Sequence, residues 1–188
     1  QVANQNLSPS LTLPFGDLPA GDTTVGQWLM EATLQGHFVD YNAEFTHTNP
    51  FGIEDISPVK QVLIHEMLMP FQATGDFDDG LPDFLANDVP DPAGVPMEPD
   101  TAHLSDGSTE PVALARDIVA DGNVSLGDLQ VDVDATVDPG FNYFRFPDPG
   151  QGDFRIVSVQ RSDGSSLPLD NVRQTDRTFL AAGQLPVY

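Results

Sequence analysis

The sequence predicts an all-β protein with little helix, made of two antiparallel β-sandwich-like units joined by an Asp/Pro-rich connector. Three observations predict this class. Gly and Pro occur 16 and 17 times among 188 residues and divide the chain with turns. The acidic residues are mostly Asp, which forms turns readily and helices poorly. Between the turns, short runs alternate apolar and polar side chains, as strands do.

Two runs show this alternation most clearly. In 129–137, Leu129, Val131 and Val133 alternate with polar or acidic residues, and 39–45 repeats the pattern. Each run predicts a strand with one buried face and one face in water. In chain order, the other expected strands are 23–34, 59–69, 111–119, 141–146, 154–161 and 177–180.

The run 59–69 is ambiguous: Val62, Ile64, Glu66 and Leu68 alternate as in a strand, but Val62, His65, Glu66 and Met69 would also fit one face of a helix. Pro58 and Pro70 bound it at a length that suits a long strand, which is the favoured interpretation.

The domain organisation follows from a change in composition. Residues 71–100 are rich in Pro, Asp and Gly and show little alternation, so they are expected to form the connector. An N-terminal immunoglobulin-like β unit is then expected at 1–70 and a C-terminal β unit at 101–188. Apolar side chains such as Phe77 and Phe84 indicate that the connector packs against something.

The charge excludes several kinds of partner. Seven Lys and Arg stand against 29 Asp and Glu, a net charge of -22. Nucleic-acid binding and attraction to an anionic membrane both need clustered cations, so neither is expected. No run approaches the ~18 apolar residues of a membrane-spanning helix, so membrane insertion is not expected either. High acidity keeps a protein soluble in salt, which favours an extracellular or cell-surface location.

The N-terminus and the cysteine count add to this picture. The chain starts at Gln1 and shows no signal-peptide pattern, so we interpret it as a processed product or a segment of a longer exported protein. Without cysteine, neither a disulfide framework nor a thiolate metal site is expected.

The densest group of hard oxygen ligands lies between residues 76 and 88, and it makes Ca2+ the candidate cofactor. Residues 79–83, Asp-Gly-Leu-Pro-Asp, resemble the end of thrombospondin type 3-like calcium repeats of bacterial surface proteins. Upstream, Gly75 and Phe77 stand where that pattern has carboxylates. A solvated acidic turn is the alternative. The candidate calcium ligands are Asp76, Asp78, Asp79, Asp83 and Asp88.

A second candidate metal site is spaced like the second half of an EF-hand-type loop. Val119 stands at a ligand position of that loop and cannot coordinate, so a loop between strands is the favoured interpretation. The candidate ligands are Asp117, Asp121, Asn123 and Asp128.

No catalytic motif is found, so the sequence does not predict an enzyme. His65-Glu66 begins like the zinc-protease motif His-Glu-x-x-His, but Met69 takes the place of the second histidine. The histidines are widely spaced, and each is expected to be an ordinary surface or half-buried residue. They are His37, His47, His65 and His103.

Aromatic residues raise a carbohydrate-binding alternative. Trp28, Phe38, Tyr41, Tyr143 and Phe144 would offer a sugar-stacking surface, although aromatics in alternating strands more often belong to a core. Glycosylation-type triplets at 6–8 and 123–125 are compatible with an exterior location.

The segment 13–23, Leu-Pro-Phe-Gly-Asp-Leu-Pro-Ala-Gly-Asp-Thr, leads into an expected strand around Trp28. It resembles a turn-and-strand segment of immunoglobulin-like (CARDB-like) β-sandwich modules in large bacterial extracellular proteins. Residues 104–107 and 161–164 are similar to the tail regions of such modules. The resemblance implies a secreted or surface structural module without catalytic residues.

Together these features predict an extracellular structural or adhesive module of a larger surface or filament-forming protein. Ca2+ would stiffen the connector, and strand edges would pair with copies of the chain or with neighbouring modules. The alternative is a carbohydrate-binding β-sandwich module accessory to a secreted enzyme, with a glycan as its ligand.

Overall fold

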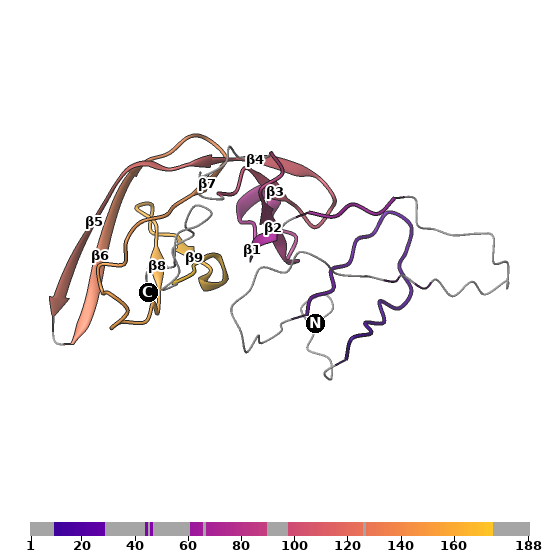
Figure 1. The fold of residues 1–188 in the computed structure, drawn as a ribbon, viewed down its shortest axis with the longest axis horizontal. Helices are drawn as coiled ribbons and strands as arrows, with labels where there is room; N and C mark the ends of the chain where they lie inside the picture. The colour runs from indigo at the N-terminus through magenta and orange to yellow at the C-terminus, as the bar shows by residue number, and fades with distance from the viewer. Residues whose placement is uncertain are drawn as a thin grey trace, which may run out of the picture. The chain divides into compact units, whose positions relative to one another are not determined.

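A computed structural model describes residues 10–28, 44, 46, 61–65, 67–89, 98–125 and 127–174. Within these ranges the elements are strands and two short 3-10 turns, which confirms the all-β class with little helix (Figure 1). None of the helical segments described is long and apolar enough to cross a membrane. The chain divides into two compact units, 27–64 and the remainder, and the strands among the described residues belong to the larger unit.

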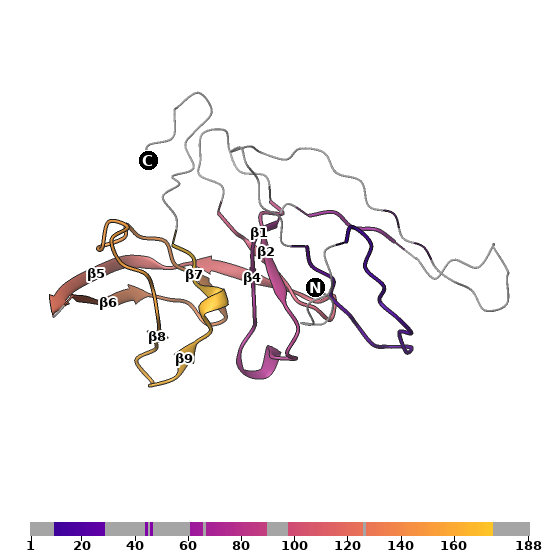
Figure 2. The ribbon, with the colours of Figure 1, turned by 90° about the horizontal axis from the view of Figure 1, so that it is seen from below.

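The main structure is a five-stranded sheet. Its strands lie in the order β1-β2-β3-β4-β7. β1 to β4 pair antiparallel, each with the next along the chain, whereas β7 pairs parallel to β4. Figure 2 shows this sheet from a second direction. The bounds are β1 Met67–Phe71, β2 Asp83–Ala86, β3 Thr101–His103, β4 Thr109–Leu114 and β7 Phe141–Tyr143.

The register of β2 on β3 separates the two faces of this sheet. Leu85 pairs with Ala102, and Phe84 pairs with His103. Because successive side chains of a strand point to opposite faces, these two pairs lie on opposite sides. One face therefore carries the apolar pair and the other carries an aromatic ring and an imidazole.

The hydrophobic core lies on the face of Leu85. It is small, since its buried residues are Phe71, Ala73, Leu85, Ala102 and Leu104, with Met69, Val112, Phe141 and Tyr143 packed against them. Asp83 is buried beside this core with 3% of its surface exposed. Its carboxylate accepts hydrogen bonds from the backbone N–H groups of Ala73 at 2.8 Å and Ser105 at 2.9 Å, so the chain that follows β1 and the turn that follows β3 are both held to it.

β5 (Arg116–Ser125) and β6 (Asp128–Thr136) form a long antiparallel hairpin. β6 confirms the strand predicted at 129–137. Asp117, at the irregularity near the base of β5, has a φ of 51°, a left-handed conformation that Asp tolerates better than most residues. The loop 148–154 packs on the hairpin, because a Cβ placed on Gly150 would meet Leu129 Cδ2 at 2.9 Å.

The remaining elements are short. η1 (Gly75–Phe77) and η2 (Leu169–Asn171) are single 3-10 turns. β8 (Val159–Gln160) and β9 (Ser166–Leu167) form a two-residue antiparallel pair closed by a turn at Gly164. They fall in the run expected as a strand at 154–161 and just after it, so that run is mostly not a strand.

Two further expectations differ from the structure. Residues 83–86, expected in the connector, form β2, an interior strand of the main sheet. This run is too short to show the alternation of a strand, and it forms one because it pairs with β1 and β3. Residues 61–65 are not a strand, because pairing with β2 starts only at Met67. The strands expected at 177–180 and, except for Glu44, at 39–45 lie outside the described residues.

Candidate metal centre

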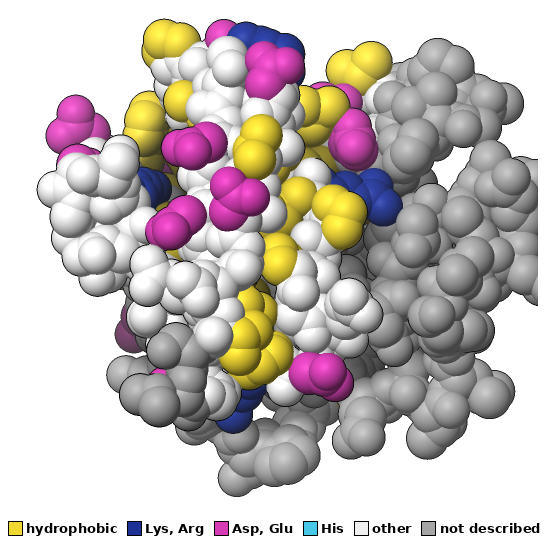
Figure 3. Space-filling model, turned by 90° about the vertical axis from the view of Figure 1, so that its left-hand side faces the viewer, with side chains coloured by type: hydrophobic (Ala, Val, Ile, Leu, Met, Phe, Trp, Pro, Cys, Tyr) yellow, Lys and Arg dark blue, Asp and Glu magenta, His cyan; other side chains and the backbone are white. Residues whose placement is uncertain are grey.

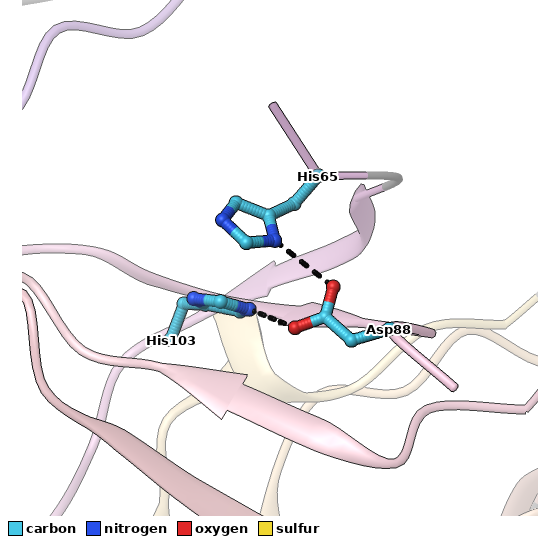
Figure 4. A group of neighbouring side chains, drawn as sticks. All are labelled: His65, Asp88 and His103. Carbon is cyan, nitrogen blue, oxygen red and sulfur yellow. Dashed lines mark hydrogen bonds and ion pairs between the residues drawn. The ribbon is translucent and has the colours of Figure 1, made fainter. Parts of the chain in front are cut away.

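Three polar side chains converge on the sheet face opposite the core: His65, Asp88 and His103 (Figure 4). Asp88 lies between the two rings. His65 Nδ1 is 2.9 Å from one carboxylate oxygen, and His103 Nε2 is 2.6 Å from the other. One nitrogen or oxygen from each residue lies within 4.8 Å of the others. The arrangement therefore presents two imidazoles and one carboxylate to a common point.

Sheet register explains this convergence. Met67 pairs with Ala86, so continuing the same antiparallel ladder by two residues sets His65 opposite Asp88. Residues two apart share a face, which puts Asp88 on the face of Phe84. His103, the cross-strand partner of Phe84, shares that face too. Three strands thus bring together residues that are 23 and 15 positions apart.

The backbone around Asp88 is held by Asp100. The Asp100 carboxylate accepts hydrogen bonds from the N–H of Asp88 at 3.0 Å and of Val89 at 2.7 Å. The hydroxyl of Thr101 donates to the same carboxylate at 2.6 Å. Burial raises the pKa of Asp100, but these hydrogen bonds together outweigh it and lower that pKa below its ordinary value. The anionic form of Asp100 therefore fixes the chain that carries Asp88.

Aromatic packing fixes the histidine rings. His103 lies flat on Phe84, with ring centroids 4.7 Å apart and planes 5° apart. The His65 ring lies 4.0 Å from the His103 ring at a tilt of 47°. The His103 side chain is 12% exposed, and those of His65 and Asp88 are somewhat more open to solvent. The cluster is thus shielded but reachable.

The electrostatics of Asp88 favour its anionic form. Partial burial alone raises the pKa of its carboxyl, but the hydrogen bonds with His65 and His103 and their positive charge when protonated lower that pKa below its ordinary value. An anionic carboxylate beside two imidazoles can accept hydrogen bonds from their N–H groups, or it can bind one cation together with them.

The five candidate calcium ligands are divided by the fold. Asp76, Asp78 and Asp79 line a recess of about 160 Å3 together with Phe77, Leu104, Ser105 and Asp106. Oδ1 of Asp78 accepts the N–H of Gly80 at 3.0 Å, and Oδ1 of Asp79 accepts that of Leu81 at 2.8 Å. These are local turn bonds, and Ser105 bonds the other Asp79 oxygen. Calcium binding in this recess stays a prediction.

The other two candidates lie elsewhere. The oxygens of Asp83 are already taken by the backbone N–H groups of Ala73 and Ser105. Asp88 belongs to the histidine cluster.

The second candidate set lies along the hairpin and is not brought together. Asp117 stands at its base, where it bonds the Thr136 hydroxyl, whereas Asp128 pairs with Ser125 beside the tip. At about 3.3 Å per residue, eight residues of strand separate these ends by ~26 Å. Asp121 and Asn123 lie between them on β5.

Sequence reasoning missed the histidine cluster. It placed Asp88 with the calcium ligands and expected His65 and His103 to be ordinary histidines, whereas the sheet joins all three. His37 and His47 lie outside the described residues. The two-residue spacing of Phe84, Ala86 and Asp88 places them on one face of a strand. This spacing would have indicated the cluster only if the pairing of β2 with its neighbours had been known.

Comparison of the chain with protein-family models, with curated proteins and with solved structures found no match. The resemblance to immunoglobulin-like (CARDB-like) modules stays a prediction.

Proposed function

We propose that this chain is an extracellular structural or adhesive β module that assembles through strand edges with copies of itself or with neighbouring modules of a longer chain. The observation that carries the proposal is the β5–β6 hairpin. In the part of the chain that the structure describes, these two long strands pair only with each other. Among the described strands, each therefore has an outer edge that pairs with no other strand, and such an edge is a template for strand addition.

The side chains of the hairpin support the same role. Val124 pairs with Leu129 and Gly122 with Val131 on one face, so that face is apolar. Although the loop 148–154 packs there, Val124 remains 61% exposed. Figure 3, which views the molecule from the left-hand side of Figure 1, where β5 and β6 lie, shows hydrophobic side chains interspersed with Asp and Glu. A two-stranded ribbon is marginal alone, and a strand added at its edge would extend the ribbon into a wider sheet.

The opposite face of the hairpin is acidic. Asp121 lies directly across from Asp132, and like charges in such pairs repel. With a net charge of -22, two copies also repel each other at low ionic strength. Salt screens this repulsion, so association should strengthen as salt increases, as in a saline exterior.

The test is the mass of the full chain by analytical ultracentrifugation at low and high salt. We expect association that grows with salt and with protein concentration. Val124→Lys places a charge on the apolar hairpin face and should keep the chain monomeric. Val157→Lys is the matched control, because Val157 is 78% exposed and lies outside the hairpin. A chain that is monomeric in all conditions would contradict the proposal, as would equal behaviour of the two variants.

A further inference from the structure

We propose that His65, Asp88 and His103 bind one divalent first-row transition-metal ion, with Zn2+ as the probe. This inference is independent of self-association, since the cluster lies on the five-stranded sheet and uses no residue of the hairpin. Its basis is the convergence of the three donors within 4.8 Å of one another.

The donor atoms select the class of ion. Imidazole nitrogens are good ligands for Zn2+, Cu2+, Ni2+ and Fe2+, whereas Ca2+ and Mg2+ take oxygen ligands almost throughout. A set of two nitrogens and one carboxylate therefore fits a transition metal. The recess at Asp76–Asp79 offers carboxylate oxygens, which suit Ca2+, so the recess and the histidine cluster would not compete for one ion.

The spacing of the donors suits such an ion. Zn–N and Zn–O bonds of about 2.0–2.2 Å put neighbouring ligand atoms of a tetrahedral site roughly 3.4 Å apart. Asp88 already lies 2.9 Å and 2.6 Å from the two ring nitrogens. An ion would replace the protons in these hydrogen bonds, and the ligand atoms would move apart by about 0.5–0.8 Å.

The ligands are also held before an ion arrives. Asp100 anchors the backbone of Asp88 through two N–H groups, and Phe84 supports the ring of His103. Such supporting contacts orient metal ligands and raise affinity. His65 precedes β1 and lies outside the strands, so it is the ligand best able to adjust. The partial exposure of all three side chains leaves an entry path and room for water as the remaining ligand.

The ion would cross-link neighbouring strands of the sheet. His65 lies just before β1, Asp88 follows β2 and His103 ends β3, so one ion would tie three strands together. His65 is also where the chain re-enters the larger unit after residues 27–64. The hydrophobic core beneath is small, so a link of this kind would add to the stability of the sheet.

The test is titration of the full chain with ZnCl2 by isothermal calorimetry, with the bound metal counted after dialysis. We expect one Zn2+ per chain, and an affinity at least tenfold weaker in each of His65→Gln, Asp88→Asn and His103→Gln. The double variant His37→Gln/His47→Gln is the matched control and should bind within about twofold of the unaltered chain. Circular dichroism confirms that each variant is folded.

A second measurement needs no variant. In the 15N-labelled chain, Zn2+ should shift the Nδ1 signal of His65 and the Nε2 signal of His103 and leave His37 and His47 unchanged. Absence of binding would overturn the proposal and leave the cluster as a hydrogen-bonded group only. Binding that survives all three substitutions, or is lost equally in the control, would also overturn it.

Discussion

The side-chain amide of Asn171 pairs with the backbone of Gln72, 99 positions away, as a strand residue would. It accepts the N–H of Gln72 at 2.7 Å and donates to the Gln72 carbonyl at 2.8 Å. Gln72 follows β1, the edge strand of the main sheet. One side chain thus satisfies both backbone groups of Gln72 just beyond that edge strand.

Replacing Asn171 by Ala should therefore destabilise the fold. The two hydrogen bonds are partly buried, and each contributes about 0.5–1.5 kcal/mol net, so we expect a loss of roughly 1–3 kcal/mol. Urea unfolding measures it. Asn123→Ala, at an exposed position of β5, is the control and should change stability by less than about 0.5 kcal/mol. Equal midpoints for Asn171→Ala and the unaltered chain would show that the pairing contributes nothing.

Asp83→Asn should be strongly destabilising. Both carboxylate oxygens of Asp83 accept backbone N–H groups, and an amide would turn an NH2 group toward one of them. A buried donor left without an acceptor costs about 1–3 kcal/mol. Asp153→Asn, at an exposed position, is the matched control. Urea unfolding of the two variants at neutral pH measures the difference, and an equal effect in both would contradict the role given to Asp83.

The effect of Asp83→Asn should also depend on pH. Burial is the main cause that raises the pKa of Asp83, aided by the charges of Asp79 and Asp106 and opposed by its two backbone hydrogen bonds. A group whose pKa is higher in the folded chain contributes stability below its unfolded pKa and loses it as pH rises through the folded value. Asp83→Asn lacks this contribution, so its loss of unfolding free energy relative to the unaltered chain should be larger at about pH 3 than at about pH 7. A deficit independent of pH would contradict this assignment.

Asp148 should show the opposite pH dependence. The hydrogen bond from Gln174 is the main cause that lowers its pKa, with help from the N–H groups of Gly152 and Gly150 and against the effect of burial. Its stabilisation is therefore present above the unfolded pKa and lost as pH falls through the lower folded value.

Amide hydrogen exchange of Gly150 and Gly152 tests this dependence. We expect protection at neutral pH, loss of protection in acid, and little protection at any pH in Asp148→Asn. Asp153→Asn should retain the pattern of the unaltered chain. Protection that is insensitive to both acid and the Asp148 substitution would show that this carboxylate does not hold the loop.

Asp100→Asn should weaken Zn2+ binding although Asp100 is not itself a ligand. Its carboxylate holds the N–H groups of Asp88 and Val89, so an amide would leave the backbone of Asp88 less well held. Loss of such supporting contacts typically costs 10–100-fold in metal affinity, and about tenfold is expected here. Calorimetry measures the change, with Asp106→Asn as a carboxylate control outside the cluster. An unchanged affinity would show that Asp100 does not help to hold Asp88 for metal binding.

The fold class could be predicted from the sequence because its signals are local. In β6, Leu129 and Val131 alternate with polar residues, and this pattern is visible within nine residues. The interior strand β2 was not predicted, because its four residues are too few to show a period. Its identity depends on pairing with β1 and β3, which lie outside any short window.

The candidate site could not be predicted for the same reason. His65 and Asp88 meet only because Met67 pairs with Ala86, and His103 joins them only because it pairs with Phe84. A shift of one residue in either register would send one ligand to the core face. The acidic run near Asp79, by contrast, attracted a calcium prediction through its density alone, while the fold uses much of it for turn hydrogen bonds.

Thermal unfolding should separate the two metal predictions. An ion at 100 times its dissociation constant stabilises the folded chain by about 2.7 kcal/mol, which corresponds to a rise of roughly 5–10 °C in the unfolding midpoint at this chain length. We expect Zn2+ to produce such a rise and His65→Gln to abolish it. Any rise with Ca2+ should survive His65→Gln, because oxygen ligands and not imidazoles would hold that ion. Measurements with a chelator supply the baseline.

A rise of less than about a degree with millimolar Ca2+ would remove the calcium prediction, since any ion that binds only the folded state must stabilise it. A Zn2+ rise that persists in His65→Gln would instead show that the ion is held elsewhere on this acidic chain.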